Sequence, residues 1–474
     1  MFQTVTLPMW ALILILGFAA VTFASHFLFP SVRWFFRRRM ERAVAKLNTH
    51  LQRPIEPFKI MRRQDQVTRL IYDPQVMEAV RAYARDEGVP PNVAFEKARS
   101  YAREIVPGFS TATYFGFAIK LAQRLSQGLY HVRIGGADTP HMNEIDSSAA
   151  VIFVMNHRSN LDYFLITWLA SKHSALSYAV GEWARVWPLK ALIRAMGAYF
   201  IRRRYSNLLY RAILARYVQM SVQQGTTQAI FPEGGLSLTG SVGQAKRGLL
   251  HYIVRGFNLH EGQDVVFVPV ALNYDRVLED RVLISAGQQG IRRFPVRARV
   301  VLGFTLRILW RKLRGTFTPF GYAAMCYGPP LSLREFMTTT PDASTETLAE
   351  DLTQRIRSAV PVLPVPFVAA AIIRCGGTCT HAQLQAECAK LRAELNALRA
   401  WIHLPDGENT DAMSDGLAAL KLRGIVTVQG AQISTKAGEE SVLGFYAAST
   451  LQRCDAPVGI ATTPHQTLQD PDAH

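Results

Sequence analysis

The spacing of apolar residues changes several times along this chain. Residues 9–29 form a run without Asp, Glu, Lys or Arg, about as long as one bilayer crossing requires. Residues 40–135 follow the 3.6-residue period of amphipathic helices. Between residues 151 and 330, short runs rich in Val, Ile and Phe alternate with amphipathic stretches. Beyond residue 335 the pattern is again mostly helical, so the chain predicts several regions of different structure.

The first helical region contains three segments that predict individual helices. One covers residues 74–87 and ends before a glycine and a proline pair. The second covers residues 92–104, with Asn92 as the expected N-cap. The third covers residues 113–127.

The middle region predicts an α/β fold with a largely buried sheet, because its apolar runs are short and amphipathic stretches separate them. A helix is expected over residues 208–223. The predicted strands are residues 151–155, 176–181, 198–201, 227–231, 265–272 and 323–328.

The last region predicts a small, mostly helical domain. Residues 360–373 are apolar but contain three prolines, which makes them a poor second membrane span, although insertion in the membrane stays open. Residues 381–402 predict a long helix and residues 424–435 a small hairpin. A helix followed by a hairpin suggests a winged-helix-like region, and the polar last 20 residues are expected to be loose.

The chain has 53 Lys and Arg against 36 Asp and Glu, a formal net charge of +17. Such a surplus favours an anionic partner. Six basic residues, from Arg33 to Lys46, follow the apolar run at 9–29, and none precedes it. The positive-inside rule therefore predicts a retained single-pass anchor with the rest of the chain in the cytosol. Anionic lipid then accounts for part of the positive charge.

A membrane-tethered nucleic-acid-binding protein is the alternative from another class. It would need a basic recognition helix. The segment 381–402 carries Lys390, Arg392 and Arg399 but also two glutamates. We therefore expect no nucleic-acid partner.

The cysteines do not predict a metal site. Cys375 and Cys379 form a CxxxC pair near His381, but no second pair completes the four ligands that zinc normally takes. Reduced cysteines in a cytosol-facing protein are the simpler interpretation.

Residues 151–163, VIFVMNHRSNLDY, combine a buried strand with groups that do chemistry. His157 follows the strand directly, and Asp162 lies five residues later, in the first turn of an expected helix. A carboxylate on one ring nitrogen would fix the tautomer, so that the other nitrogen takes a proton from a hydroxyl. The helix N-terminus would also offer N–H groups to an anion.

A purely structural interpretation of the same residues stays open. Ser159-x-x-Asp162 matches a capping box, which needs no catalysis. Ser159 is a poor nucleophile candidate, because no GxSxG motif surrounds it. From these residues alone, catalysis and capping are both possible.

The segment NHRSNLDY resembles the His-x-x-x-x-Asp motif of glycerolipid acyltransferases, in the form found in glycerol-3-phosphate acyltransferases. Further segments resemble the family's other blocks, in the same order. They are GAYFIRR (197–203), FPEGGLSLTG (231–240), VPVALNYDRVLE (268–279), YGPPLSL (327–333) and LGFY (443–446). The resemblance covers residues 110–335 well and the C-terminal part loosely.

The resemblance implies a glycerolipid-acyltransferase-like sheet flanked by helices, and it supplies names for the regions. They are an anchor with a basic segment (1–45), a helical N-terminal region (46–135), an acyltransferase catalytic domain (136–335) and a C-terminal helical region (336–474). The implied reaction moves a fatty acyl group from acyl-CoA or acyl-carrier protein to the 1-hydroxyl of glycerol 3-phosphate. It takes place at a membrane, on the cytoplasmic face of a bacterial inner membrane.

The resemblance also implies roles for individual residues. His157 is the general base and Asp162 orients it, with no cofactor, no metal and no acyl-enzyme. The implied substrate-binding residues are Arg158, Ser159, Arg202, Arg203, Glu233, Gly234, Ser237 and Lys246. The two arginines at 202 and 203 suit a phosphate clamp.

The chain departs from the family at Leu236 and Leu238, where arginines that contact the acceptor phosphate are usual. The loss of two charge-assisted bonds, each roughly 1.5–3 kcal/mol, would weaken a phosphate site. Either Lys246 and Arg247 compensate, or the acceptor differs. 1-Acylglycerol 3-phosphate (lysophosphatidic acid) is then the alternative acceptor, and a non-catalytic lipid-binding protein is a further one.

Overall fold

The computed structural model places most of the chain. Contacts divide it into two units, residues 1–55 with 172–174, and residues 56–171 with 175–474. The first unit is described only by helical turns between residues 9 and 17. The described residues are 8–10, 12–17, 61, 63–135, 144–169, 171, 176–180, 193, 194, 196–202, 207–290, 303, 307, 308, 310–404 and 409–454.

The second unit is built on an eight-stranded sheet in the order β1-β7-β6-β2-β5-β3-β4, with β8 also paired to β6. Most neighbours are parallel, and β6 pairs antiparallel with β7 and β8. The strands are β1 (His131–Gly135), β2 (Ala150–Met155), β3 (Ser177–Val180), β4 (Tyr199–Phe200), β5 (Gln228–Ile230), β6 (Val265–Tyr274), β7 (Tyr322–Tyr327) and β8 (Leu331–Ser332).

The apolar composition of the central strands agrees with their position in the middle of the sheet. Every residue of β2, β5 and β6 is buried, as is typical of parallel strands covered on both faces. Because these three strands run parallel, their carboxyl ends lie at one edge of the sheet, where open α/β sheets bind ligands. The predicted α/β class and all six predicted strands are confirmed, whereas β1 and β8 were not predicted.

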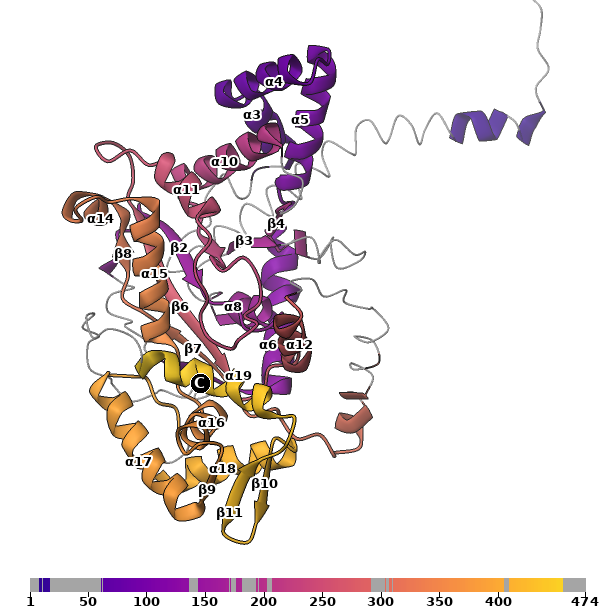
Figure 1. Ribbon diagram of the computed structural model, residues 1–474. Helices are drawn as coiled ribbons and strands as arrows, with labels where there is room; N and C mark the ends of the chain where they lie inside the picture. The colour runs from indigo at the N-terminus through magenta and orange to yellow at the C-terminus, as the bar shows by residue number, and fades with distance from the viewer. Residues whose placement is uncertain are drawn as a thin grey trace, which may run out of the picture. The chain divides into compact units, whose positions relative to one another are not determined.

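Helices cover the sheet and extend from it (Figure 1). They are α3 (Arg63–Ile71), α4 (Pro74–Asp86), α5 (Pro91–Ile105), the π-helix η1 (Ala112–Ala118), α6 (Ile119–Leu129), α8 (Asp162–Leu169), α10 (Leu208–Gln223), α11 (Gly248–Arg255), α12 (Asp280–Gln288), α14 (Leu333–Thr339), α15 (Thr345–Ala359), α16 (Pro364–Arg374), α17 (His381–Ala397), α18 (Asn409–Leu422) and α19 (Glu440–Cys454).

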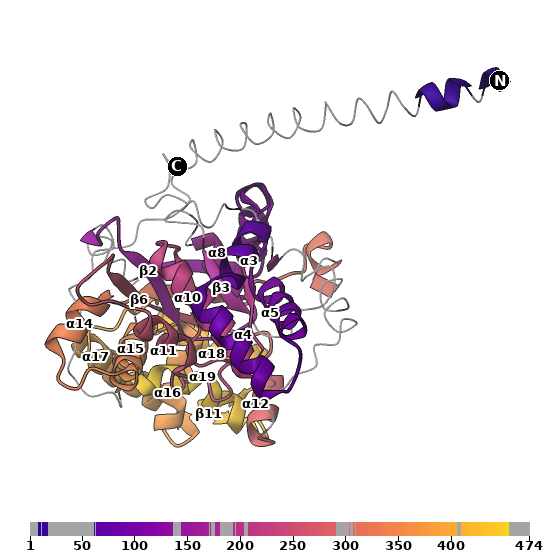
Figure 2. The ribbon, with the colours of Figure 1, turned by 90° about the horizontal axis from the view of Figure 1, so that it is seen from above.

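The three helices α3, α4 and α5 pack with α10. They lie at one end of this unit in Figure 1, and Figure 2 shows them grouped beside α10. The prediction for α4 was right within a residue. The N-cap predicted at Asn92 was wrong, because α5 begins one residue earlier at Pro91 and its N-cap is Pro90. Proline fits the first helical position, since its φ is already helical and no N–H is needed there.

The C-terminal region is organised around α16, whose residues from Pro364 to Ile372 are all buried. Of the three prolines that suggested a broken segment, Pro361 precedes the helix and the other two lie in its first turn, where they are tolerated. Residues 360–373 therefore form a protein core with α17, α18 and α19 around it. The predicted hairpin is present as β10 (Val426–Gln429) and β11 (Gln432–Thr435), and β9 (Thr378–Thr380) is a third strand beside β11.

The predicted helix 381–402 ends early, at Ala397. Arg399 takes a positive φ of 50°, and the chain then turns back toward the sheet. Trp401 packs closely on β1, where a Cβ on Gly135 would overlap the indole ring. Trp401 is thus buried against the sheet and is not part of the helix.

Across the described residues, no helix has both the length and the apolar character needed to cross a membrane. The anchor predicted at residues 9–29 lies largely outside the described residues.

Candidate active site

The carboxyl end of β2 brings His157 and Asp162 together. His157 Nδ1 lies 2.9 Å from Asp162 Oδ2, and both side chains are buried. The imidazole ring also packs against Phe231, with ring centroids 4.2 Å apart, and edge-on against Tyr163. No hydrogen bond of His157 Nε2 is found within the described part of the chain. This geometry fixes the imidazole on Asp162 through Nδ1.

Asp162 is held by four hydrogen bonds. Its Oδ2 accepts from His157 Nδ1 and from the backbone N–H groups of Arg158 and Ser159, at 2.6 and 3.0 Å. Its Oδ1 accepts from the Tyr274 hydroxyl at 2.5 Å. Burial first, and then the Asp162 charge, raises the pKa of Tyr274 well above its ordinary value, so its hydroxyl stays a donor.

The backbone N–H groups of the turn are all occupied. Those of Arg158 and Ser159 bind Asp162, and that of Asn160 faces Glu279 at 3.3 Å. Those of the next two residues bind the hydroxyl and the carbonyl of Ser159. The expectation that this helix N-terminus offers N–H groups to an anion was therefore wrong. The protein's own carboxylates and the serine have taken that place.

Half of the expected capping box is present. The Asp162 carboxylate accepts from the Ser159 N–H, as a capping box requires. The Ser159 hydroxyl does not cap the Asp162 N–H, because it donates to Glu279 at 2.8 Å and accepts from the Leu161 N–H. Ser159 therefore lies in a hydrogen-bonded turn with Glu279, away from the His157 ring nitrogens.

Two side chains tie the turn to neighbouring strands. The Asn156 amide pairs with both backbone groups of Leu272 on β6, at 2.7 and 2.9 Å. Glu233, just after β5, accepts from the His157 N–H at 3.1 Å and from the Gly243 N–H at 3.0 Å. Burial raises the pKa of Glu233, while these N–H groups lower it. The ends of β2, β5 and β6 are thus linked directly beside His157.

Arg158 is fully buried behind the turn. Its Nη1 donates to the Gly240 carbonyl, and its guanidinium carbon lies 5.0 Å from the ring centroid of Phe445. Its Nε and Nη2 have no hydrogen-bond partner in the described structure. Burial lowers its pKa. Arg158 connects the turn to α19 of the C-terminal region.

The loop after β5 carries Gly234, Ser237 and Lys246. Ser237 donates its N–H to the His157 carbonyl at 2.8 Å, and its hydroxyl donates to the Ser241 carbonyl at 2.6 Å. Gly234 has a positive φ of 66°, and a Cβ there would lie 2.9 Å from the exposed Lys246 side chain. The loop therefore holds His157 from one side and places a lysine beside the glycines.

Arg202 is engaged by the helical region. Its Nε and Nη2 bind the two carboxylate oxygens of Glu104 at 2.8 and 2.5 Å, and its guanidinium lies over Tyr101. The bond to Glu104 raises the pKa of Arg202. Arg203 lies outside the described residues. The phosphate role of both arginines stays a prediction.

The two leucines that depart from the family pattern are half-buried. Leu238 lies against Gly287 of α12: a Cβ added to this glycine would be 3.3 Å from the Leu238 Cβ. Leu236 is in the same loop. Neither side chain can donate a hydrogen bond to a phosphate.

Three residues of this site were not assigned roles from the sequence. Tyr274 and Glu279 lie in the fourth family block, so their positions carried a signal, but their partners are more than 100 residues away. Phe445 lies in the LGFY segment. Gly240 has a φ of 87°, and a Cβ there would be 1.8 Å from the Phe445 carbonyl oxygen.

Comparison with known protein families finds a match over the part of the chain that contains most of this site. Residues 138–273 match the family described as Acyltransferase. This range contains the His157 turn, the loop after β5 and most of β6.

Curated relatives are similar over a longer part of the chain. A glycerol-3-phosphate acyltransferase from Pseudomonas fluorescens (strain Pf0-1) is 26% identical over 66% of this chain and 39% of its own length. One from Xanthomonas campestris pv. campestris is 26% identical over 76% of this chain and 42% of its own length. The chain thus spans about two fifths of the length of these relatives.

Among solved structures, the 1-acyl-sn-glycerophosphate (LPA) acyltransferase PlsC from Thermotoga maritima is 22% identical. The match covers 50% of this chain and 75% of that chain, with a TM-score of 0.32.

Proposed function

We propose that this chain, whose residues 138–273 match the family described as Acyltransferase, transfers a fatty acyl group from a thioester to the 1-hydroxyl of glycerol 3-phosphate. The observation that carries the proposal is the buried His157–Asp162 pair at the carboxyl end of β2. A hydroxyl must lose its proton to attack a thioester, and an imidazole held through Nδ1 can accept that proton at Nε2.

The proposed reaction is a direct transfer. The acceptor hydroxyl gives its proton to His157 Nε2 while its oxygen bonds to the acyl carbon. The tetrahedral intermediate then collapses, the carbon–sulfur bond breaks, and His157 returns the proton to the leaving thiolate. The Asp162 charge stabilises the imidazolium between these steps. No acyl-enzyme forms.

The oxyanion and the phosphate need donors from outside the turn, because its N–H groups are occupied. We assign the phosphate contact to Lys246, which lies beside Gly234 and is exposed. Arg247, the next residue, forms an exposed ion pair with Glu346 at the start of α15. Arg202 would contribute only after it leaves Glu104.

Lysophosphatidic acid is the second acceptor that we consider. The observation that favours it is the half-buried apolar pair Leu236 and Leu238, at positions where the resemblance implies arginines. Such a surface suits an acceptor that already carries an acyl chain.

We also place the reaction at the cytoplasmic face of a membrane, with residues 9–29 as the anchor and acyl-CoA or acyl-carrier protein as the donor. The large apolar side chains from Met9 to Leu16 that the structure describes are exposed, and exposed apolar surface of this kind suits a lipid environment. Both donors are anionic, and the chain carries a net charge of +17.

The test uses the detergent-solubilised full chain with either donor, and offers glycerol 3-phosphate and lysophosphatidic acid separately. Acylation of glycerol 3-phosphate with a raised KM in Lys246→Gln supports the proposal. Arg247→Gln is the matched control, and its KM should change little. Product from the lysolipid alone would assign the second acceptor. No product from either acceptor with either donor would contradict acyl transfer.

A further inference from the structure

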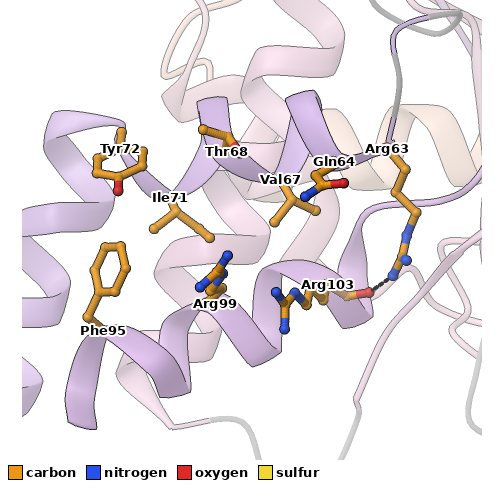
Figure 3. A pocket seen from close by; sticks show the side chains of 9 residues that line it. All are labelled: Arg63, Gln64, Val67, Thr68, Ile71, Tyr72, Phe95, Arg99 and Arg103. Carbon is orange, nitrogen blue, oxygen red and sulfur yellow. Dashed lines mark hydrogen bonds between the residues drawn. The ribbon is translucent and has the colours of Figure 1, made fainter. Parts of the chain in front are cut away.

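A cavity of about 550 Å³ lies between α3 and α5, outside the His157 site (Figure 3). Its volume falls within the roughly 300–1,000 Å³ that small-molecule sites occupy. The six residues that matter for its chemistry are Arg63, Ile71 and Tyr72 from the α3 side, and Phe95, Arg99 and Arg103 from α5. We call it the α3–α5 groove.

The groove is polarised along its length. Figure 3 shows Ile71, Tyr72 and Phe95 at one end, and Arg63 and Arg103 at the other. The rings of Tyr72 and Phe95 are in contact, with centroids 5.7 Å apart, and Tyr72 is 66% exposed. One end therefore presents apolar and aromatic surface to any ligand that enters.

The opposite end concentrates positive charge. Arg63 is fixed by hydrogen bonds to the carbonyls of Val106 and Arg103, so its guanidinium is anchored between the two helices. Burial, and then the charge of Arg103, lowers the pKa of Arg63. Arg99 points into the same groove, and its ion pair with Glu96, at 3.2 Å, is exposed.

No lining side chain of the groove is acidic. Arg63 and Arg103 repel one another, Arg99 lines the same groove, and a bound anion would offset this positive charge. Guanidinium groups also match the geometry of a phosphate oxygen pair. The basic end therefore has the chemistry of a phosphate site.

We propose that the α3–α5 groove binds an anionic phospholipid. Its phosphate lies against Arg63, Arg99 and Arg103, and the start of an acyl chain lies over Ile71 and Phe95. A free phosphate would leave the apolar end unused, and a zwitterionic lipid would leave the arginines less well compensated. The groove contains no residue of the His157 turn.

The test uses the full chain in detergent and a phosphatidylglycerol probe with a diazirine in its acyl chain. After irradiation, the labelled peptides are identified by mass spectrometry. The expected label lies on α3 and on the first turns of α5. Label on other parts of the chain alone would overturn the proposal.

Variants separate the groove from general surface charge. Arg99→Gln/Arg103→Gln removes two of its charges, and Arg81→Gln/Arg85→Gln removes two exposed charges from α4. A basic residue near anionic lipid contributes roughly 1 kcal/mol, which is about fivefold in affinity. Groove labelling should therefore fall about fivefold to thirtyfold in the first variant and stay unchanged in the second. Equal labelling in both would overturn the proposal.

Competition identifies the ligand chemistry. Unlabelled phosphatidylglycerol should displace the probe, and Tyr72→Ser should weaken labelling although all three arginines remain. Displacement by inorganic phosphate at equal concentration would mean a simple anion site. Equal displacement by phosphatidylcholine would mean that charge plays no part. Stronger displacement by acyl-CoA would assign the groove to the donor. Each of these three results would overturn the lipid proposal.

Discussion

Replacement of Asp162 by asparagine would test the charge of the site while its geometry is kept. The Oδ2 position accepts two backbone N–H groups and His157 Nδ1, so the amide oxygen must take that position. The amide nitrogen then faces the Tyr274 hydroxyl, which can accept where it previously donated. All four contacts survive, and only the negative charge is lost.

The expected loss follows from that charge. A carboxylate and an imidazolium whose charge centres are about 4 Å apart attract by about 4 kcal/mol at an effective dielectric of about 20. At about 1.4 kcal/mol per factor of ten, kcat should fall about a thousandfold. This lies within the roughly 10²–10⁴-fold that general base catalysis contributes.

The assay compares kcat for acyl transfer in wild type, Asp162→Asn and Asp351→Asn, with thermal unfolding of each. Asp351 pairs with Arg355 on α15 and is a surface control for the same chemical change. The control should keep its rate. If Asp162→Asn keeps its melting temperature and more than a tenth of the wild-type rate, the Asp162 charge does not stabilise the imidazolium as described.

Three further changes concern stability. Gly240→Ala should unfold at a clearly lower temperature than Gly262→Ala. Both glycines have a φ near 87°, but only a Cβ at position 240 would meet a backbone atom, the Phe445 carbonyl oxygen at 1.8 Å. Equal melting temperatures would contradict the close packing of α19. Burial raises the pKa of Asp275 to about 7, so folding favours its protonated form, and stability should fall as pH rises from about 4 to about 7. In Asp275→Asn, the free energy of unfolding measured with urea should not fall over this pH range. An equal fall in the variant and the wild type would contradict the prediction. Tyr274→Phe should lower the free energy of unfolding by about 1.5–3 kcal/mol, because a buried hydrogen bond to the Asp162 carboxylate is lost. A free energy of unfolding in urea equal to that of the wild type would argue against this bond.

The sequence predicted the elements whose residues are uniformly apolar or regularly amphipathic. The runs that became β2 and β6 are buried on both faces, so each read as a strand without knowledge of its neighbours. The strand β1 was missed, because His131 and Arg133 interrupt its apolar residues and its place is set by pairing with β7. The helix α16 was not predicted, because the prolines in its first turn suggested a broken segment.

Within the site, the contacts between residues close in the sequence could be predicted, and the contacts between distant residues could not. His157 and Asp162 are five residues apart, and their hydrogen bond followed from a turn at a strand end. The occupation of the turn's N–H groups could not be predicted from local spacing, because Glu279, which accepts from one of them, lies 119 residues away. The packing of Phe445 on Arg158 is likewise a long-range contact.

The most direct test of the account is acyl transfer by the full chain with His157→Ala. His260→Ala is the control, because His260 is exposed in a loop before β6. Both acceptors are offered, so that the result does not depend on which one the protein uses. We expect His157→Ala to lose at least about a hundredfold in kcat while it keeps the wild-type melting temperature, and His260→Ala to be unaffected. A folded His157→Ala variant that transfers acyl groups at the wild-type rate would contradict it.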